Sequence, residues 1–184
     1  VLRARLADAA FFFEQDKKRD LEHFVGKLEE RRFLEGLGTM ADKAQRLSAL
    51  SGRMARLLAP GDEDTAAMAT RAGLLAKADL STDMVNEFAS LQGLMGEIYS
   101  GLSGEPDAVS AAMAEHYWPR FAGDNLPNSI VSVSVALADR FDNIVGCFSL
   151  GLEPTGSADP YALRRQALGI NRTLAFVRPA PSLS

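Results

Sequence analysis

The stretch from Ile130 to Leu150 is the most apolar part of the chain and constrains the fold more than any other segment. Its beginning, Val131-Ser132-Val133-Ser134-Val135, alternates apolar and polar residues as a half-buried strand does. Further along, apolar residues continue at helical spacings of three and four: Leu137, Phe141, Val145 and Phe148. Because the longer pattern is helical, we predict a central helix here that other elements must cover.

Other segments share the helical period, and turn residues separate them. An amphipathic helix is predicted at the start of the chain, with Leu2, Leu6, Ala9 and Phe13 on one side. Thr39 and Asp42 have the spacing of a capping box at the start of a helix that Pro60-Gly61 ends. Further helices are predicted at 62–80 and 91–102, from Pro106 to Tyr117, and from Asp159 as N-cap with Pro160 in the first turn. No segment predicts a convincing sheet, so the expected fold class is all-α.

The composition is that of a globular chain of one domain. Of the 184 residues, 47% are hydrophobic and 24% are charged, and no apolar run is long enough to cross a bilayer. We expect one helical domain over residues 1–176 and a poorly ordered Pro/Ser tail over 177–184. No signal peptide precedes Val1, and Cys147 has no second cysteine to pair with, so a cytoplasmic location without membrane contact is expected.

The charges exclude a wholly basic nucleic-acid-binding surface, because the net charge is −4. Residues 1–58 nevertheless carry an excess of Lys and Arg, and local basic patches remain candidates for RNA contact. His116 and Arg120 flank Tyr117 and Trp118, a group that could stack on a nucleotide or simply form a packing corner. Paired arginines such as Arg164-Arg165 can bind phosphates, or they can contact another domain.

Familiar catalytic signatures are missing from the sequence. It contains no Gly-rich phosphate loop, no Gly-x-Ser-x-Gly elbow, no Cys-x-x-Cys pair and no His-Glu-x-x-His helix. Cys147 lies in the apolar stretch, where a thiol is typical of the core. We therefore predict no catalytic residue in this chain.

Several uncommon strings point to one family. The longest is Lys77-Ala78-Asp79-Leu80-Ser81-Thr82-Asp83-Met84-Val85-Asn86-Glu87-Phe88, closing with Leu91-Gln92-Gly93-Leu94-Met95-Gly96. Others lie at residues 1–9, 115–124, 154–157 and 159–165. In this order they resemble the beta subunit of bacterial heterotetrameric glycyl-tRNA synthetase over nearly the whole chain, and the chain is expected to be an internal piece of such a subunit.

The resemblance implies a part of an α2β2 glycine–tRNA ligase. The expected partners are the alpha subunit, tRNA(Gly) and other domains of the beta subunit. The alpha subunit would carry the catalytic site, and ATP and Mg would serve the whole enzyme without binding to this piece. A helical body that aids tRNA binding or positions neighbouring domains is the expected role, and a purely structural spacer is the alternative.

The same region of the family resembles the HD superfamily of metal-dependent phosphohydrolases, which are helical bundles with a His, His-Asp and Asp metal site. Here Asp79 would stand in the His-Asp pair, preceded by Ala78, and Asp139 would be the final Asp. The only histidines, His23 and His116, match neither position, so a degenerate site without metal is expected and a working hydrolase is the rival hypothesis. Asp139 is predicted to be partly buried and hydrogen-bonded, with Lys77, Arg71 or Arg140 as possible partners for the two carboxylates.

Overall fold

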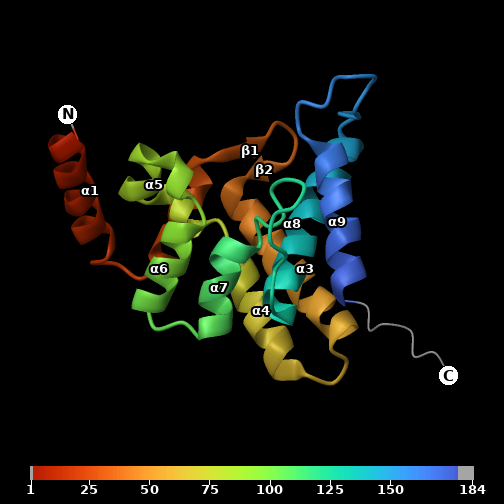
Figure 1. Ribbon diagram of the computed structural model, residues 1–184, viewed down its shortest axis with the longest axis horizontal. Coiled ribbons are helices and arrows are strands. Elements are labelled where there is room, and N and C mark those ends of the chain that lie inside the picture. Colours follow the sequence, from red (N-terminus) through yellow and green to blue (C-terminus); the bar gives the residue numbers. More distant parts are fainter. Residues whose placement is uncertain (1, 178–184) are drawn as a thin grey trace.

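The computed structural model describes residues 2–177 and shows helices packed around a central helix (Figure 1). The predicted all-α class is confirmed, because a single two-stranded hairpin is the only sheet in the described part of the chain. The longer helices are α1 (Leu2–Asp16), α3 (Met40–Leu58), α4 (Glu63–Leu75), α6 (Leu94–Leu102), α7 (Asp107–Glu115), α8 (Ile130–Ser149) and α9 (Leu163–Val177). The shorter elements are α2 (Leu21–Lys27), η1 (Leu28–Glu30), β1 (Arg32–Leu34), β2 (Gly38–Thr39), η2 (Ala78–Ser81), α5 (Asp83–Glu87) and η3 (Ala89–Leu91).

Helix α8 is the predicted central helix, and it packs against α3, α4, α7 and α9. Its N-cap is Ser129, whose hydroxyl accepts a hydrogen bond from the Ser132 amide at 3.1 Å. Residues 131–140 are all buried, serines included, so this part of the helix is covered on every side. The alternation at 131–135 therefore reflects a helix buried all round and not a half-buried strand.

Two predicted helix boundaries are confirmed at α3. The Thr39 hydroxyl accepts a hydrogen bond from the Asp42 amide at 3.2 Å, and the Asp42 carboxylate accepts one from the Thr39 amide at 2.8 Å. Both halves of the capping box are thus present. The helix ends at Leu58, just before Pro60-Gly61.

Other predicted boundaries are wrong by several residues. Helix α4 ends at Leu75 and not near residue 80, because the chain turns into η2, where the Thr82 amide and hydroxyl both donate to the Asp79 carbonyl. The helix expected from residue 91 begins at Leu94, after Gly93 with φ +84°. Helix α7 ends at Glu115, so Tyr117 lies outside it, and Pro106 is its N-cap.

The start of α9 and the hairpin also differ from expectation. Helix α9 begins at Leu163, yet the Asp159 carboxylate still accepts hydrogen bonds from the amides of Leu163 and Arg164 at 2.8 and 3.0 Å. Strands β1 and β2 were not predicted; they pair antiparallel across a turn in which Gly36 has φ +91°. Of the predicted tail, Val177 belongs to α9, and residues 178–184 lie outside the described residues.

Helix α1 lies at one edge of the molecule, beside α5 and away from α8 (Figure 1). Its last residue, Asp16, is buried and connects it to the rest of the structure. The Asp16 carboxylate accepts hydrogen bonds from the amides of Asp83 and Met84, at 3.0 and 2.9 Å, and from the Tyr99 hydroxyl at 3.0 Å. One side chain therefore joins α1 to α5 and α6.

Replacing Asp16 with Ala should lower the free energy of unfolding by about 2–4 kcal/mol. The change leaves the buried Met84 amide, the buried Tyr99 hydroxyl and the partly buried Asp83 amide without an acceptor. Each loss of this kind costs about 1 kcal/mol or more. Urea unfolding followed by circular dichroism measures this effect. Asp8→Ala, at an exposed position of the same helix, is the matched control. Equal stability of the two variants would show that Asp16 does not hold α1 in place.

Candidate functional site

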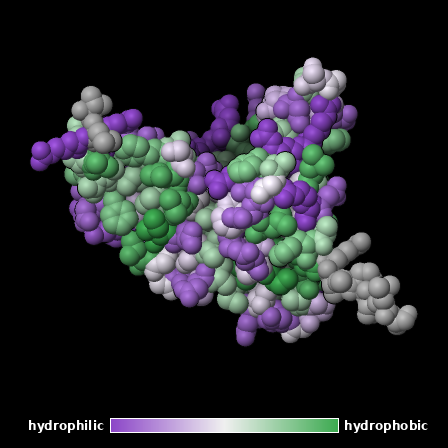
Figure 2. Space-filling view, in the orientation of Figure 1, coloured by the Kyte–Doolittle hydropathy of each residue, from purple (hydrophilic) through white to green (hydrophobic). Residues whose placement is uncertain are grey.

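A cavity of about 420 Å³ opens between α3, α8, α9 and the segments that follow α4 and α7. Figure 2 shows the surface hollowed between the part of the molecule that holds α5 and α6 and the part that holds α9. Charged side chains dominate its polar lining: Lys43, Lys77, Arg120, Asp139, Arg140 and Arg165. The cavity is thus the place where the predicted candidates Arg120, Asp139, Arg165 and His116 meet.

Asp139 lies at the centre of this lining and is only 8% exposed. Its carboxylate forms ion pairs with the ammonium groups of Lys43 and Lys77, each at 2.9 Å. Burial alone would raise the pKa of Asp139, but these two cations hold it well below its usual range. The predicted burial and hydrogen bonding of Asp139 are confirmed, and of the three possible partners it pairs with Lys77.

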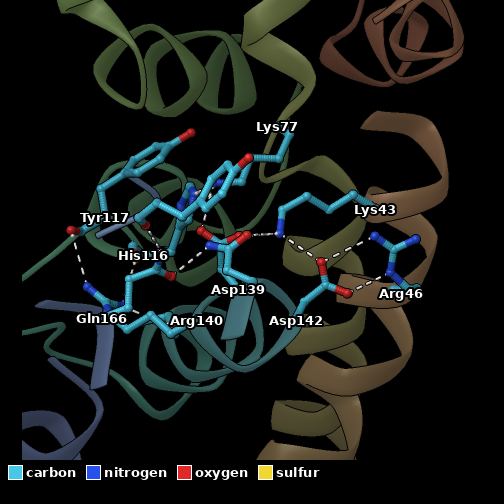
Figure 3. A network of polar contacts seen from close by, with 12 residues as sticks. Lys43, Arg46, Lys77, His116, Tyr117, Asp139, Arg140, Asp142 and Gln166 are labelled. Atoms are coloured by element: carbon cyan, nitrogen blue, oxygen red, sulfur yellow. Dashed lines mark hydrogen bonds and ion pairs between the residues drawn. The ribbon is translucent and has the colours of Figure 1, made fainter. Parts of the chain in front are cut away.

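The ion-pair network continues from Lys43 along one side of α8 (Figure 3). Lys43 also contacts the Asp142 carboxylate and the Asn143 amide oxygen, both at 2.8 Å. Asp142 in turn accepts hydrogen bonds from Arg46, the shorter at 2.6 Å. Lys43 is buried, so its charge is met by protein groups and not by water.

His116 is buried beside Lys77 at the other end of the network. Its Nδ1 lies 2.9 Å from the Ala112 carbonyl oxygen, and its Nε2 lies 2.9 Å from Lys77 Nζ. The carbonyl can only accept, so Nδ1 carries the proton and Nε2 accepts from the ammonium group. Burial and the neighbouring Lys77 charge lower the pKa of His116 to about 3, which keeps the ring neutral.

Arg140 fixes the loop after α7. Its guanidinium donates hydrogen bonds to four consecutive carbonyl groups, those of residues 116–119, at 2.7 to 3.3 Å. Arg140 therefore has a structural role and does not pair with Asp79 or Asp139. Arg71, the other suggested partner, instead binds Glu22 and Glu105.

Asp79 has a separate environment from Asp139. It is buried, and one of its oxygens accepts a hydrogen bond of 2.6 Å from the Gly93 amide. Burial raises the pKa of Asp79 despite this bond. Within residues 2–177, no group of three or more His, Cys, Asp or Glu side chains is placed to hold a metal ion.

These residues do not fit the metal that an HD-type site would require. Such a site needs neutral imidazoles and carboxylates that can turn their lone pairs to the ion. Both Asp139 oxygens already face ammonium groups. The imidazole beside them, that of His116, already accepts a hydrogen bond from Lys77 at its unprotonated Nε2. A divalent cation would have to displace these internal cations.

The remaining predicted contact residues are exposed. Arg120 lies on the rim of the cavity, with its Nε 3.6 Å from an Asp124 carboxylate oxygen. Arg164 and Arg165 are both exposed in the first turn of α9, but only Arg165 lines the cavity. The structure thus separates the paired arginines and brings Arg120 and Arg165 to one opening.

Sequence reasoning missed Lys43, Arg46 and Asp142, which form the ion pairs at one end of the network. A signal existed for Lys43, because it stands at helical spacing with Leu47 and Leu50 on the apolar side of α3. A lysine at such a position must find a buried anion. Asp142 lies about a hundred residues further along the chain, and nothing local connects the two.

Comparison with known proteins gives the family. The family model of the glycyl-tRNA synthetase beta subunit matches residues 1–179. The chain belongs to this family. The glycine–tRNA ligase beta subunit of Desulforamulus reducens is 54% identical over 170 residues, which are 92% of this chain and 24% of the relative. That of Mannheimia succiniciproducens is 52% identical over 174 residues, 95% of this chain and 25% of the relative. The chain spans about a quarter of the length of the curated relatives it matches.

The string that most resembled the glycyl-tRNA synthetase beta subunit family forms one wall of the site. Residues 77–96 supply Lys77 to the ion pairs, Asp79 to the Gly93 amide and Gln92 to the Tyr117 hydroxyl. Cys147 is buried, as expected for a core thiol. Among the described residues of this family member, no helix combines the length and hydrophobicity needed to cross a membrane.

The buried histidine predicts a dependence of stability on pH. An unfolded histidine titrates near pH 6.5, whereas the pKa of folded His116 is about 3. Between these values the unfolded state binds the additional proton, so stability is full above pH 6.5 and falls as the pH is lowered. The groups facing the ring are Lys77, Asp139 and Arg140.

In the wild-type protein, protonation of unfolded His116 should lower the unfolding free energy by at most roughly 1.4 kcal/mol per pH unit between pH 6.5 and 4.5. We expect His116→Gln to remove this contribution, so that its stability falls less over the same range. Urea midpoints across this range measure it. His23→Gln, which removes the exposed histidine, is the matched control and should keep the wild-type slope. Parallel slopes in wild type and His116→Gln would contradict the assignment of a neutral, buried His116.

Proposed function

We propose that this chain is a non-catalytic helical body within the beta subunit of an α2β2 glycine–tRNA ligase. The whole enzyme would attach glycine to tRNA(Gly) in the cytoplasm, using ATP and Mg at a site in the alpha subunit. This body would aid tRNA binding or hold neighbouring domains of the beta subunit in position. Positioning contributes to rate because a misplaced acceptor end cannot reach the activated amino acid.

The observation that carries this proposal is the closed ion-pair network around Asp139. Its carboxylate is neutralised by Lys43 and Lys77, both buried, and the adjacent His116 is neutral. A network of this kind fixes α3, α8 and the segment at residue 77 relative to one another, and it presents no nucleophile or general base. It therefore supports a rigid scaffold over the rival phosphohydrolase.

A role in tRNA binding is supported by exposed arginines at the start of α9 and at the cavity opening. Arg164 and Arg165 stand in the first turn of α9, and Arg120 lies across the cavity opening. Arginine suits phosphate recognition because its planar guanidinium can bind two oxygens at once. The name shared by the relatives, glycine–tRNA ligase beta subunit, gives tRNA as the nucleic acid concerned.

A structural spacer remains a second candidate, favoured by exposed apolar side chains on α8 and α9. Val145 and Leu168 are both 63% exposed, and Phe176 is 58% exposed. The relatives are about four times as long as this chain, so other parts of the subunit could cover this surface. In that case the helical body would position domains without touching RNA.

Replacing Arg164 and Arg165 together with Ala should raise the KM for tRNA in the assembled enzyme and leave glycine-dependent ATP–pyrophosphate exchange unchanged. We expect a rise of about tenfold, the factor that corresponds to about 1.4 kcal/mol of lost binding. The effect should shrink at high salt, since phosphate contacts weaken as salt rises. Aminoacylation kinetics and the exchange assay measure the two properties separately.

Arg3→Ala with Arg53→Ala is the control, since it removes the same charge from exposed positions on α1 and α3. Loss of exchange in a tetramer that still assembles would place chemistry in this chain and contradict the proposal. An unchanged KM with normal exchange would favour the spacer.

A further inference from the structure

The cavity is strongly cationic, although the chain as a whole carries a net charge of −4. Five basic side chains line it, Lys43, Lys77, Arg120, Arg140 and Arg165, against the single carboxylate of Asp139. Asp142 and Asp124 lie behind this lining and pair with Lys43 and Arg120. Positive charge therefore remains in excess at the surface of the cavity, where it attracts anions.

The excess is greatest at the rim. Lys43 and Lys77 are held by carboxylates, and Arg140 is held by backbone carbonyls. Arg165 is exposed, and the described residues offer its side chain no carboxylate or hydrogen-bond partner. Arg120 is exposed, and within residues 2–177 its guanidinium has one carboxylate contact, at 3.6 Å to Asp124. Two guanidinium groups are thus available at one opening.

Besides these charges the cavity lining contains one phenyl ring and amide groups. Phe33 of β1 is half-buried and lines the cavity. Gln92 and Gln166 also line it. The Gln166 amide already bonds Asn143 and Tyr161. Gln92 Nε2 donates to the Tyr117 hydroxyl, so the Gln92 amide oxygen is the acceptor that could bind a base edge. The volume of about 420 Å³ lies within the range of small-molecule sites, which is roughly 300–1,000 Å³.

We propose that this cavity binds one nucleoside monophosphate unit, with the phosphate at Arg120 and Arg165 and the base against Phe33. Guanidinium groups suit phosphate, and an aromatic face stacks on any base. The unit is either a free nucleotide or an unpaired nucleotide of an RNA strand, since both present the same chemistry. The RNA source rests on the proposed function, whereas the free nucleotide does not.

Photo-crosslinking of the assembled enzyme tests this site. The probes are 4-thiouridine 5′-monophosphate and a short single-stranded RNA that contains 4-thiouridine, and mass spectrometry locates the labelled peptides. We expect label where the base would lie, at Phe33 or in residues 162–166, from at least one probe. The nucleoside 4-thiouridine, which lacks the phosphate, should label them about tenfold less, as expected for the loss of a charge-assisted contact.

Arg165→Ala should reduce the cavity label about tenfold, and Phe33→Leu should also reduce it. Arg53→Ala, an exposed arginine outside the cavity, should not. Both Arg165 and Arg53 are exposed, so neither variant is expected to impair folding. Label from the free nucleotide alone identifies a nucleotide site, and label from the RNA identifies a site for an unpaired nucleotide.

Absence of cavity label with both probes, or equal label in Arg165→Ala and wild type, would overturn the proposal. If this absence is accompanied by a raised KM for tRNA in the Arg164 and Arg165 double variant, the cavity site fails and the proposed function stands. Label from the free nucleotide with an unchanged KM gives the opposite result, in which the cavity site stands and the tRNA role fails.

Discussion

The carboxylate of Asp139, shared between two buried lysines, is the interaction on which the site depends. Lys43 comes from α3, Lys77 from the segment after α4, and Asp139 from the central helix. Each of the three charges would be costly to bury alone, and together they offset one another's loss of hydration. The packing of these elements and the charged state of the three groups therefore depend on each other.

These buried ion pairs explain why the lining of the adjacent cavity is positively charged. The lysines that neutralise Asp139 and Asp142 place cations at the base of the cavity. His116 stays neutral because it is buried beside the charge of Lys77. Arg140 holds the loop at residues 116–119, which forms one edge of the cavity. The lining is consequently pre-formed, positive and poor in groups that could act as a base, which suits binding more than hydrolysis.

The sequence predicted the parts of the fold that local patterns determine. The apolar period of α8, the capping box at Thr39 and Asp42, and the end of α3 before Pro60-Gly61 are all short-range features, and the structure confirms them. The early end of α4 was not predicted, although the chain turns there into η2. Lys77, two residues after the helix, pairs with Asp139, which lies 62 residues further along the chain.

The site was predictable only in part. The burial of Asp139 followed from its place in an apolar helix, and the family resemblance drew attention to residues 77–96. Lys43 and Asp142 form an ion pair although they are 99 residues apart in the chain, and no local sequence pattern predicts this contact. Arg120 and Arg165 likewise meet only because α9 packs on α8.

A double-mutant cycle between Lys77 and Asp139 tests most directly whether the shared carboxylate holds these elements together. Asp139→Ala should lower the unfolding free energy by about 3–5 kcal/mol, because it leaves Lys77 buried without a carboxylate. Lys77→Met should lower it by less, because Asp139 keeps its ion pair with Lys43. The double variant removes both charges, so its loss should be smaller than the sum of the single losses by about 1–3 kcal/mol. Losses that simply add would show that Lys77 and Asp139 do not stabilise each other, and would contradict the dependence of the site on their ion pair.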